Sequence, residues 1–180
     1  MEFSIKTINR LFGLLLIAFL LNAVITFKFG TLKEVVIDKP KSYVSSTNVD
    51  RTLDCLAMNI YKEAGHETFE GKVAVAQVTL NRVDSPYFPN DICGVVYQKN
   101  FVMEKVICQF SWYCTGMQKD KPIDAAYKES YAVAKKVLLE GFRLDSLRDA
   151  LYYHAVYVSP AWPYEKITKI GNHIFYRNKK

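Results

Sequence analysis

Three glutamates in one short stretch, Glu63, Glu67 and Glu70, are well suited to acid–base chemistry. Glu63 is expected in the last turn of a helix, where the negative end of the helix dipole disfavours a charged carboxylate. Partial burial beside the apolar side of that helix would also disfavour the charge, so both effects raise the pKa of Glu63. A general acid that cleaves a glycosidic bond must stay protonated near neutral pH. Glu63 is therefore the candidate catalytic residue.

Glycosidases commonly use a second carboxylate as base or nucleophile. Glu67 is the first candidate for this role, and Glu70 is the next. Because Glu67 follows a glycine-containing turn, its spacing from Glu63 does not by itself place both carboxylates in one cleft. Alternatively, Glu67 bonds backbone amides at the start of the next helix, where the dipole favours a negative charge. We retain Glu67 as a candidate substrate contact.

The glutamates lie at the junction of two predicted helices. Gly65 is expected to end the first helix in the left-handed conformation that glycine adopts readily. The apolar stripe of this first helix consists of Val49, Leu53, Leu56, Ala57, Ile60, Tyr61 and Ala64. The second helix is predicted from about residue 70 or 71 to Arg82, and apolar residues nearly encircle it, as is typical of a central core helix. It would hold Glu63 in place, and Arg82 is interpreted as a structural hydrogen-bond donor, with a substrate contact as the alternative.

Local patterns predict the other elements of the chain. They are a short helix at 92–98, an extended segment at 106–114, a helix at 122–140, and strands at 150–158 and 173–177. Asn90 or Asp91 is expected to cap the short helix. Asp120 is expected to cap the longer helix and Gly141 to end it.

Five segments occur in an order that is typical of one enzyme family. Residues 60–82 resemble the opening motif of the SleB/CwlJ-like cell-wall hydrolases, with the sequence IYKEAGHETFEGKVAVAQVTLNR. The later segments are SPYFPNDICGVVYQ, CQFSWYC, LYYHAVYVSPAW and ITKIGNHIFYR, so the resemblance covers about residues 52–177. It implies a mainly helical, lysozyme-like α+β domain with a small β-sheet. It also implies cleavage of peptidoglycan between N-acetylmuramic acid and N-acetylglucosamine.

The resemblance further implies a lytic transglycosylase, a mechanism that needs a single acid. Glu63 would protonate the glycosidic oxygen and then take the proton of the C6 hydroxyl of the same muramic acid, which leaves a 1,6-anhydro ring. In the family the Q-F-S-W block lies beside the acid, so Gln109 and Ser111 would hydrogen-bond the sugar. Trp112 either stacks on a sugar ring or packs in the core. Tyr61 and Tyr153 are further candidate donors that orient the substrate.

Residues 11–27 form an uncharged apolar run of 17 residues, LFGLLLIAFLLNAVITF. A helix of this length spans roughly 25 Å, at the short end for crossing a bilayer. Lys6 and Arg10 precede the run as in a signal sequence, and bulky residues at its end favour an uncleaved signal anchor over a cleaved peptide. We therefore assign residues 1–28 to a transmembrane anchor, 29–50 to a polar linker and 51–180 to the catalytic domain.

Positive charge around the run does not favour export of the catalytic domain. More lysines follow the run than precede it, namely Lys28, Lys33, Lys39 and Lys41, whereas positive residues usually stay in the cytoplasm. A wall substrate nevertheless requires the domain to lie in the periplasm or cell envelope, and it would be secreted if residues 1–28 were cleaved.

The amino-acid composition limits the classes of binding partner that are expected. With 24 basic and 18 acidic residues the net charge is +6, which suits an anionic polymer such as peptidoglycan or a solvated basic surface. Basic clusters with interleaved aromatics are absent from the sequence, so no nucleic-acid partner is expected. The protein is expected to be monomeric. Proximity in the sequence suggests the disulfides Cys108–Cys114 and Cys55–Cys93, with buried free thiols as the alternative.

Two alternatives to the glycan-cleaving enzyme remain. A zinc amidase would need ligands such as His66, His154 and His173, but His66 to Glu70 does not form the H-E-x-x-H motif. A wall-binding module without activity would not need the intact motif around Glu63. We expect no metal and no cofactor.

Overall fold

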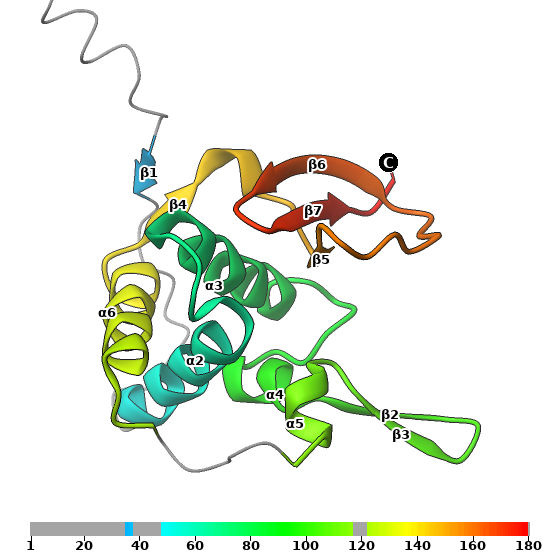
Figure 1. Ribbon diagram of the computed structural model, residues 1–180, viewed down its shortest axis with the longest axis horizontal. Helices are drawn as coiled ribbons and strands as arrows, with labels where there is room; N and C mark the ends of the chain where they lie inside the picture. Colours follow the sequence, from blue (N-terminus) through cyan, green and yellow to red (C-terminus); the bar gives the residue numbers. More distant parts are fainter. Residues whose placement is uncertain (1–34, 38–47, 117–121, 180) are drawn as a thin grey trace, which may run out of the picture. The chain divides into compact units, whose positions relative to one another are not determined.

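The computed structural model describes residues 35–37, 48–116 and 122–179, which form a mixed α+β domain (Figure 1). The helices of this part of the chain are α2 (Val49–Ala64), α3 (Phe69–Val83), α4 (Ile92–Val96), α5 (Ser111–Cys114), α6 (Ala125–Leu138) and the 3-10 helix η1 (Asp145–Leu147). Its strands are β1 (Val35–Ile37), β2 (Lys99–Val102), β3 (Lys105–Cys108), β4 (Phe142–Leu144), β5 (Tyr152–Ala155), β6 (Glu165–Ile170) and β7 (His173–Arg177). Strands β1 and β4 pair, β2 and β3 form a hairpin, and β5, β7 and β6 form an antiparallel sheet in that order.

Helix α3 is the central element of the domain, as its apolar composition predicts. Residues 71–80 are all buried, and the helix packs against α2, α4, α6 and β4 (Figure 1). Thr68 caps its start, because the Thr68 hydroxyl accepts a hydrogen bond from the backbone N–H of Gly71 at 3.3 Å. The helix extends slightly beyond both of its predicted ends.

A buried glutamine joins α3 to β4. The side-chain amide of Gln77 donates to the Leu144 carbonyl at 3.0 Å and accepts from the Leu144 backbone N–H at 2.7 Å. Both partners lie in the interior, so each satisfies groups that would otherwise be buried without a hydrogen bond.

The last turn of α3 holds the segment that leads into β5. The side-chain amide of Asn81 donates to the carbonyls of Leu147 and Ala150, each at 2.8 Å. Arg82 donates through Nε to the Leu151 carbonyl, also at 2.8 Å. Arg82 therefore acts as the structural donor that the sequence suggested, and the start of β5 is fixed against α3.

The β5–β7–β6 sheet covers one end of α3. The predicted strand at 173–177 is confirmed as β7, whose Phe175 is fully buried. The predicted strand at 150–158 was too long, because a turn closed by the Val158 N–H and the Ala155 carbonyl ends β5 at Ala155. Strand β6 was not predicted.

The extended segment predicted at 106–114 was wrong in its second half. Strand β3 ends at Cys108, and Ser111–Cys114 is helical. The Cys108–Cys114 disulfide explains the difference, because its Cα atoms are 5.7 Å apart. Six residues of continuous strand would separate the same atoms by roughly 20 Å, so the chain must coil to close this bond.

The second disulfide joins α2 to α4. Cys55 and Cys93 are bonded with their Cα atoms 5.3 Å apart, so both observed pairings are those suggested by proximity. Asp91 caps α4 by accepting a hydrogen bond from the Gly94 N–H at 2.7 Å, as one of the two expected caps.

Two of the predicted capping residues differ from the structure. Asp124, not Asp120, caps α6: its carboxylate accepts from the Tyr127 N–H at 2.7 Å, and Asp120 lies outside the described residues. Gly65 was expected to be left-handed, but its φ of −55° and ψ of −32° are right-handed. A Cβ at Gly65 would lie 2.5 Å from the Tyr61 carbonyl oxygen, so close backbone approach accounts for the glycine.

The predicted anchor at 11–27 and most of the predicted linker lie outside the described residues. Within the linker range, residues 35–37 form β1, which pairs antiparallel with β4. No helix in the described part of the chain is long and apolar enough to cross a membrane.

The Gln77 linkage gives a test of how α3 is held. We expect Gln77→Leu to lower the free energy of unfolding by about 2–3 kcal/mol, because the backbone groups of Leu144 stay buried and lose both partners. Urea denaturation of the wild type and the variant measures the change. Lys135→Ala, on the exposed side of α6, is the control and should change it by less than about 0.5 kcal/mol. A Gln77→Leu protein as stable as the control would contradict this role.

Candidate active site

Glu63 is half-buried in the last turn of α2, where that helix approaches β5. Its Oε2 accepts a hydrogen bond from the Tyr153 hydroxyl at 3.1 Å. Burial raises the pKa of Glu63 above its ordinary value, while the Tyr153 hydrogen bond and the charge of Arg82 lower it by less. The acid form of Glu63 is therefore favoured relative to an exposed glutamate, as the sequence suggested.

Glu63 lines two hollows of the described domain. The elbow hollow, named for the turn at 65–68 between α2 and α3, has a volume of about 540 Å³. It is lined by Tyr61, Lys62, Glu63, Ala64, Gly65, His66, Glu67, Asp124, Ala126, Ala155, Val156, Tyr157, Asn172 and His173. The Trp162 hollow has a volume of about 290 Å³ and is lined by Glu63, Arg82, Cys108, Gln109, Phe110, Ser111, Tyr152, Tyr153 and Trp162. A carboxyl group shared by two hollows can act on a bond that lies between them.

Tyr61 contributes to the elbow hollow through a fixed hydroxyl. It donates to Oδ2 of Asp124 at 2.7 Å, and this hydrogen bond raises the pKa of Tyr61. The pKa of Asp124 is lowered by hydrogen bonds from the Tyr127 N–H and the Tyr61 hydroxyl, so Asp124 is charged near neutral pH. The predicted residue Tyr61 thus lies near Glu63, with its proton directed to Asp124.

Glu67 lines the elbow hollow and also fastens the β6–β7 turn to the elbow. Its carboxylate accepts hydrogen bonds from the Asn172 side chain at 2.9 Å and from the Asn172 backbone N–H at 3.3 Å. A Cβ at Gly171 would lie 2.0 Å from Glu67 Oε2, so only glycine leaves room for this contact. Glu70 lies in the first turn of α3 and lines neither hollow.

The Trp162 hollow brings together residues from four distant parts of the chain. Gln109 and Ser111, predicted to lie beside the acid, line it together with Glu63 and Tyr153. Arg82 forms part of its wall, with its guanidinium stacked near the rings of Phe88 and Phe110 at 5.1 and 5.3 Å. Nη1 of Arg82 is buried and has no hydrogen-bond partner in the described part of the chain.

The two tryptophans have different environments. Trp112 packs in the core and is only 7% exposed, with its ring edge-on to Tyr97 at 6.1 Å. It therefore takes the core position, which was one of the two alternatives, and does not line the Trp162 hollow. Trp162 is 39% exposed and faces the site, a role that the sequence analysis missed. Its place in a proline-flanked turn was the available signal, because loops lie at the surface and often carry binding residues.

The three histidines do not gather as metal ligands. His66 is exposed at the elbow, and His173 is buried, which lowers its pKa. The ring of His154 lies 2.9 Å from both the Tyr176 hydroxyl and the Ala155 carbonyl. Within the described residues, no three His, Cys, Asp or Glu side chains are arranged to hold a metal ion.

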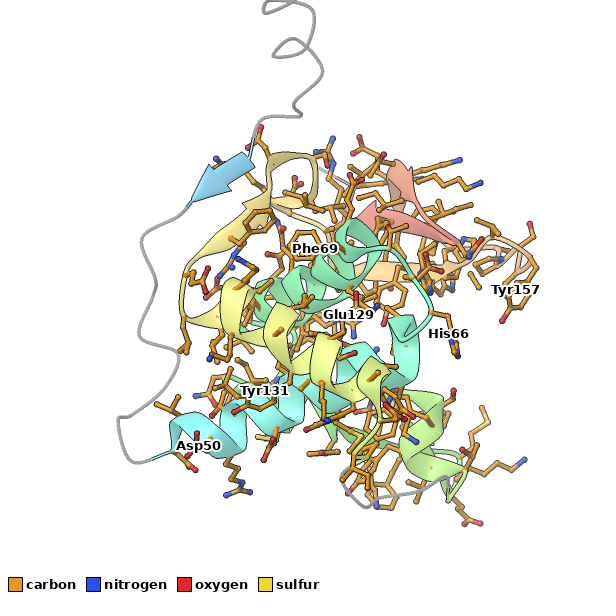
Figure 2. All side chains as sticks on the ribbon, turned by 60° about the vertical axis from the view of Figure 1, so that its left-hand side comes forward. Asp50, His66, Phe69, Glu129, Tyr131 and Tyr157 are labelled. Atoms are coloured by element: carbon orange, nitrogen blue, oxygen red, sulfur yellow. A yellow bond between two sulfur atoms is a disulfide. The ribbon has the colours of Figure 1, made fainter. Side chains whose placement is uncertain are left out.

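The hydrogen bond from Tyr153 leads to a prediction about the pKa of Glu63. Tyr153→Phe should raise the pKa of Glu63 further, because the variant lacks the donor that stabilises the carboxylate. A ¹³C NMR titration of the glutamate side chains measures the shift. Tyr131, labelled in Figure 2, lies on α6 and lines neither hollow. Tyr131→Phe is therefore the control and should leave the pKa of Glu63 unchanged. A lower or unchanged pKa in Tyr153→Phe would show that the hydrogen bond does not stabilise the charged form.

Two solved structures resemble this domain. The catalytic domain of the SleB protein of Bacillus cereus is 27% identical with a TM-score of 0.55, and the match covers 78% of this chain and 100% of that one. The catalytic domain of the germination-specific lytic transglycosylase SleB of Bacillus anthracis is 28% identical with a TM-score of 0.57, covering 74% of this chain and 100% of that one.

Curated relatives and a family model agree with this likeness. A spore cortex-lytic enzyme of Bacillus subtilis is 33% identical over 124 residues, which are 67% of this chain and 35% of the relative. One of Bacillus cereus is 32% identical over 127 residues, which are 68% of this chain and 43% of the relative. The chain thus spans less than half the length of these relatives. The model of the Cell Wall Hydrolase family matches residues 66–176, beginning three residues after Glu63. Because that match covers well over half of the sequence, the chain belongs to the cell wall hydrolase family.

Proposed function

We propose that this protein degrades peptidoglycan by cleaving the glycan strand between N-acetylmuramic acid and N-acetylglucosamine, as a lytic transglycosylase with Glu63 as its single catalytic acid. The observation that carries the proposal is the position of Glu63, a half-buried carboxyl with a raised pKa shared by two hollows. The membership of the cell wall hydrolase family supports the substrate class. The description of the Bacillus anthracis SleB catalytic domain as that of a lytic transglycosylase supports the reaction type.

The proposed reaction has two proton transfers through one carboxyl group. Glu63 donates its proton to the bridging oxygen as the bond from C1 of muramic acid to that oxygen breaks. The C6 hydroxyl of the same muramic acid then attacks C1, and its proton passes to the Glu63 carboxylate. The products are a 1,6-anhydro-muramic end and an N-acetylglucosamine with a free C4 hydroxyl, and Glu63 is again protonated.

The surroundings of Glu63 suit both halves of this cycle. Burial favours the acid that begins it, while the Tyr153 hydroxyl and the Arg82 charge stabilise the carboxylate that forms midway. Among the described residues that line the Trp162 hollow, Glu63 is the only carboxylate. In the elbow hollow, Glu67 is already bonded to Asn172 and Asp124 to Tyr61. This arrangement favours a mechanism without a second catalytic carboxylate.

Substrate contacts are proposed for the predicted residues that line the hollows. Gln109 and Ser111 would donate to sugar hydroxyl or N-acetyl groups, and Tyr153 would orient the acid. Tyr61 and Glu67 would contact the substrate in the elbow hollow. Because Trp112 is buried, we do not retain it as a contact.

We also propose that residues 11–27 anchor the protein in a membrane, with the catalytic domain outside the cytoplasm. The support is the uncharged apolar run itself and the location of the proposed substrate. The net charge of +6 would favour contact with an anionic wall polymer.

Digestion of purified peptidoglycan by the full-length protein tests the proposed reaction. The wild type should release fragments with the mass of anhydro-muropeptides, and Glu63→Gln should reduce their rate of release by about 10²- to 10⁴-fold because it removes the general acid. Mass spectrometry of the soluble fragments gives both the rate and the product type. Glu104→Gln, in the exposed turn of the β2–β3 hairpin, is the matched control and should be as active as the wild type.

Other products would point to other functions. Reducing-end sugars would indicate attack by water and a second carboxylate such as Glu67 or Glu70. Free stem peptides would indicate an amidase. Binding to peptidoglycan without any release by the wild type would indicate a wall-binding module.

A further inference from the structure

The two hollows beside Glu63 differ in size and in surface. The elbow hollow is almost twice the volume of the Trp162 hollow, at about 540 against 290 Å³. Its rim carries charged and exposed side chains, whereas Arg82 and Glu63 are the charged residues among those lining the other. His66 and Tyr157 both line the elbow hollow, and Figure 2 shows them on the same side of the molecule. Tyr157 is 88% exposed.

The proposed substrate has the same kind of asymmetry. In a glycan strand of the wall, N-acetylglucosamine carries no large substituent, whereas N-acetylmuramic acid carries a lactyl group and a charged stem peptide. A site that cleaves between the two sugars must therefore offer more room on one side of its acid than on the other, with charged side chains on that side for the peptide.

We propose that the elbow hollow holds the N-acetylmuramic acid and the start of its stem peptide, and that the Trp162 hollow holds the N-acetylglucosamine. This assignment rests on the proposed function, because it places the two sugars of the scissile bond on opposite sides of Glu63. It fixes the direction of the strand across the domain: the anhydro end forms in the elbow hollow, and the free C4 hydroxyl is released from the Trp162 hollow.

Trp162 has the properties of a platform for an unsubstituted sugar ring. Its indole is 39% exposed and is held edge-on by surrounding rings. The centroid distances are 5.3 Å to His154, 5.7 Å to Tyr176, 5.8 Å to Tyr164 and 6.4 Å to Tyr152. A large aromatic ring held in one orientation supplies apolar contact area at little cost in conformational entropy. Gln109 and Ser111 line the same hollow and supply groups for the polar edge of the sugar.

The elbow hollow has the properties of a site for a charged peptide. Lys62 and Asp124 line it, with opposite charges, and Asp124 is kept ionised by its hydrogen bonds. Stem peptides carry free carboxylate groups and, in many walls, a free amine, so both signs of charge find partners here. Tyr157, in the turn after β5, lines this hollow and is largely exposed, so it is available to contact the peptide.

Two forms of the substrate, with and without stem peptides, distinguish the contributions of the two hollows. Intact peptidoglycan and the same glycan strands stripped of stem peptides by an amidase would be digested by wild-type protein and by Tyr157→Ala and Trp162→Ala. Tyr157→Ala should lower kcat/KM on intact strands and so reduce the ratio of intact to stripped activity by roughly threefold or more. Trp162→Ala should lower kcat/KM by roughly five- to tenfold on both substrates and leave the ratio unchanged, because its contact does not involve the peptide.

Matched variants exclude loss of folding as the cause. Trp162→Phe should recover most of the activity lost in Trp162→Ala, because it keeps an aromatic face. Phe101→Ala, an exposed aromatic of the β2–β3 hairpin that lines neither hollow, should behave as wild type on both substrates. Melting temperatures are compared for every variant. A ratio that changes in Trp162→Ala but not in Tyr157→Ala would reverse the assignment, and equal responses of both variants would overturn it.

A binding measurement tests the assignment of the two hollows even if the protein catalyses a reaction other than the proposed one. Trp112 is buried and Trp162 is exposed, so a change in tryptophan fluorescence with soluble N-acetylglucosamine oligomers reports on the Trp162 hollow. The Glu63→Gln protein should show this change, and Glu63→Gln combined with Trp162→Phe should not. No change in the first protein would overturn the assignment of N-acetylglucosamine to this hollow. Absence of anhydro products together with a positive fluorescence change would instead contradict only the proposed reaction.

Discussion

The arrangement of the candidate site depends on the polar side chains of the buried helix α3, which need hydrogen-bond partners in the interior. Gln77, Asn81 and Arg82 lie on α3, and burial of their amide and guanidinium groups without hydrogen bonds would cost several kcal/mol in sum. Their partners are backbone groups of residues 144–151, nearly seventy positions later in the chain. Satisfying them places the start of β5 against the end of α3, and Tyr153 then reaches Glu63. The core and the candidate acid are therefore held by the same contacts.

The same burial sets the protonation of Glu63 and has a cost in stability. Because the pKa of Glu63 is raised in the folded protein, the folded state binds more protons than the unfolded chain at pH values between the ordinary and the raised pKa. The contribution of Glu63 to stability is thus present below the ordinary glutamate pKa and is lost as pH rises through the raised one. Tyr153 and Arg82 limit this loss by stabilising the carboxylate. In the proposed mechanism Glu63 acts first as acid and then as base, and these opposing effects stabilise one form each.

Much of the fold follows from local patterns, and the differences arise from long-range contacts. The stripe from Val49 to Ala64 and the apolar helix that ends with Asn81 and Arg82 are periodic enough to predict α2 and α3. Residues 111–114 have the alternation of a strand, yet the Cys108–Cys114 bond requires a coil that alternation does not encode. Strand β6, EKITKI, carries charged residues and is recognisable only from its pairing with β7.

The candidate site shows the same division. The family resemblance predicted that Gln109 and Ser111 lie beside Glu63. All three residues line the Trp162 hollow. The sequence left open whether Trp112 stacks on a sugar or packs in the core, and the turn that carries Trp162 was not recognised as part of the site. The disulfide-closed turn at 108–114 directs Trp112 into the core against Tyr97, whereas the β5–β6 connection presents Trp162 on the ring cluster of the sheet. Strand β7 supplies Tyr176 to that cluster, and Glu67 hydrogen-bonds Asn172 in the turn that precedes β7. The residues on the two sides of Glu63 are therefore positioned in part by the same strand and its turn.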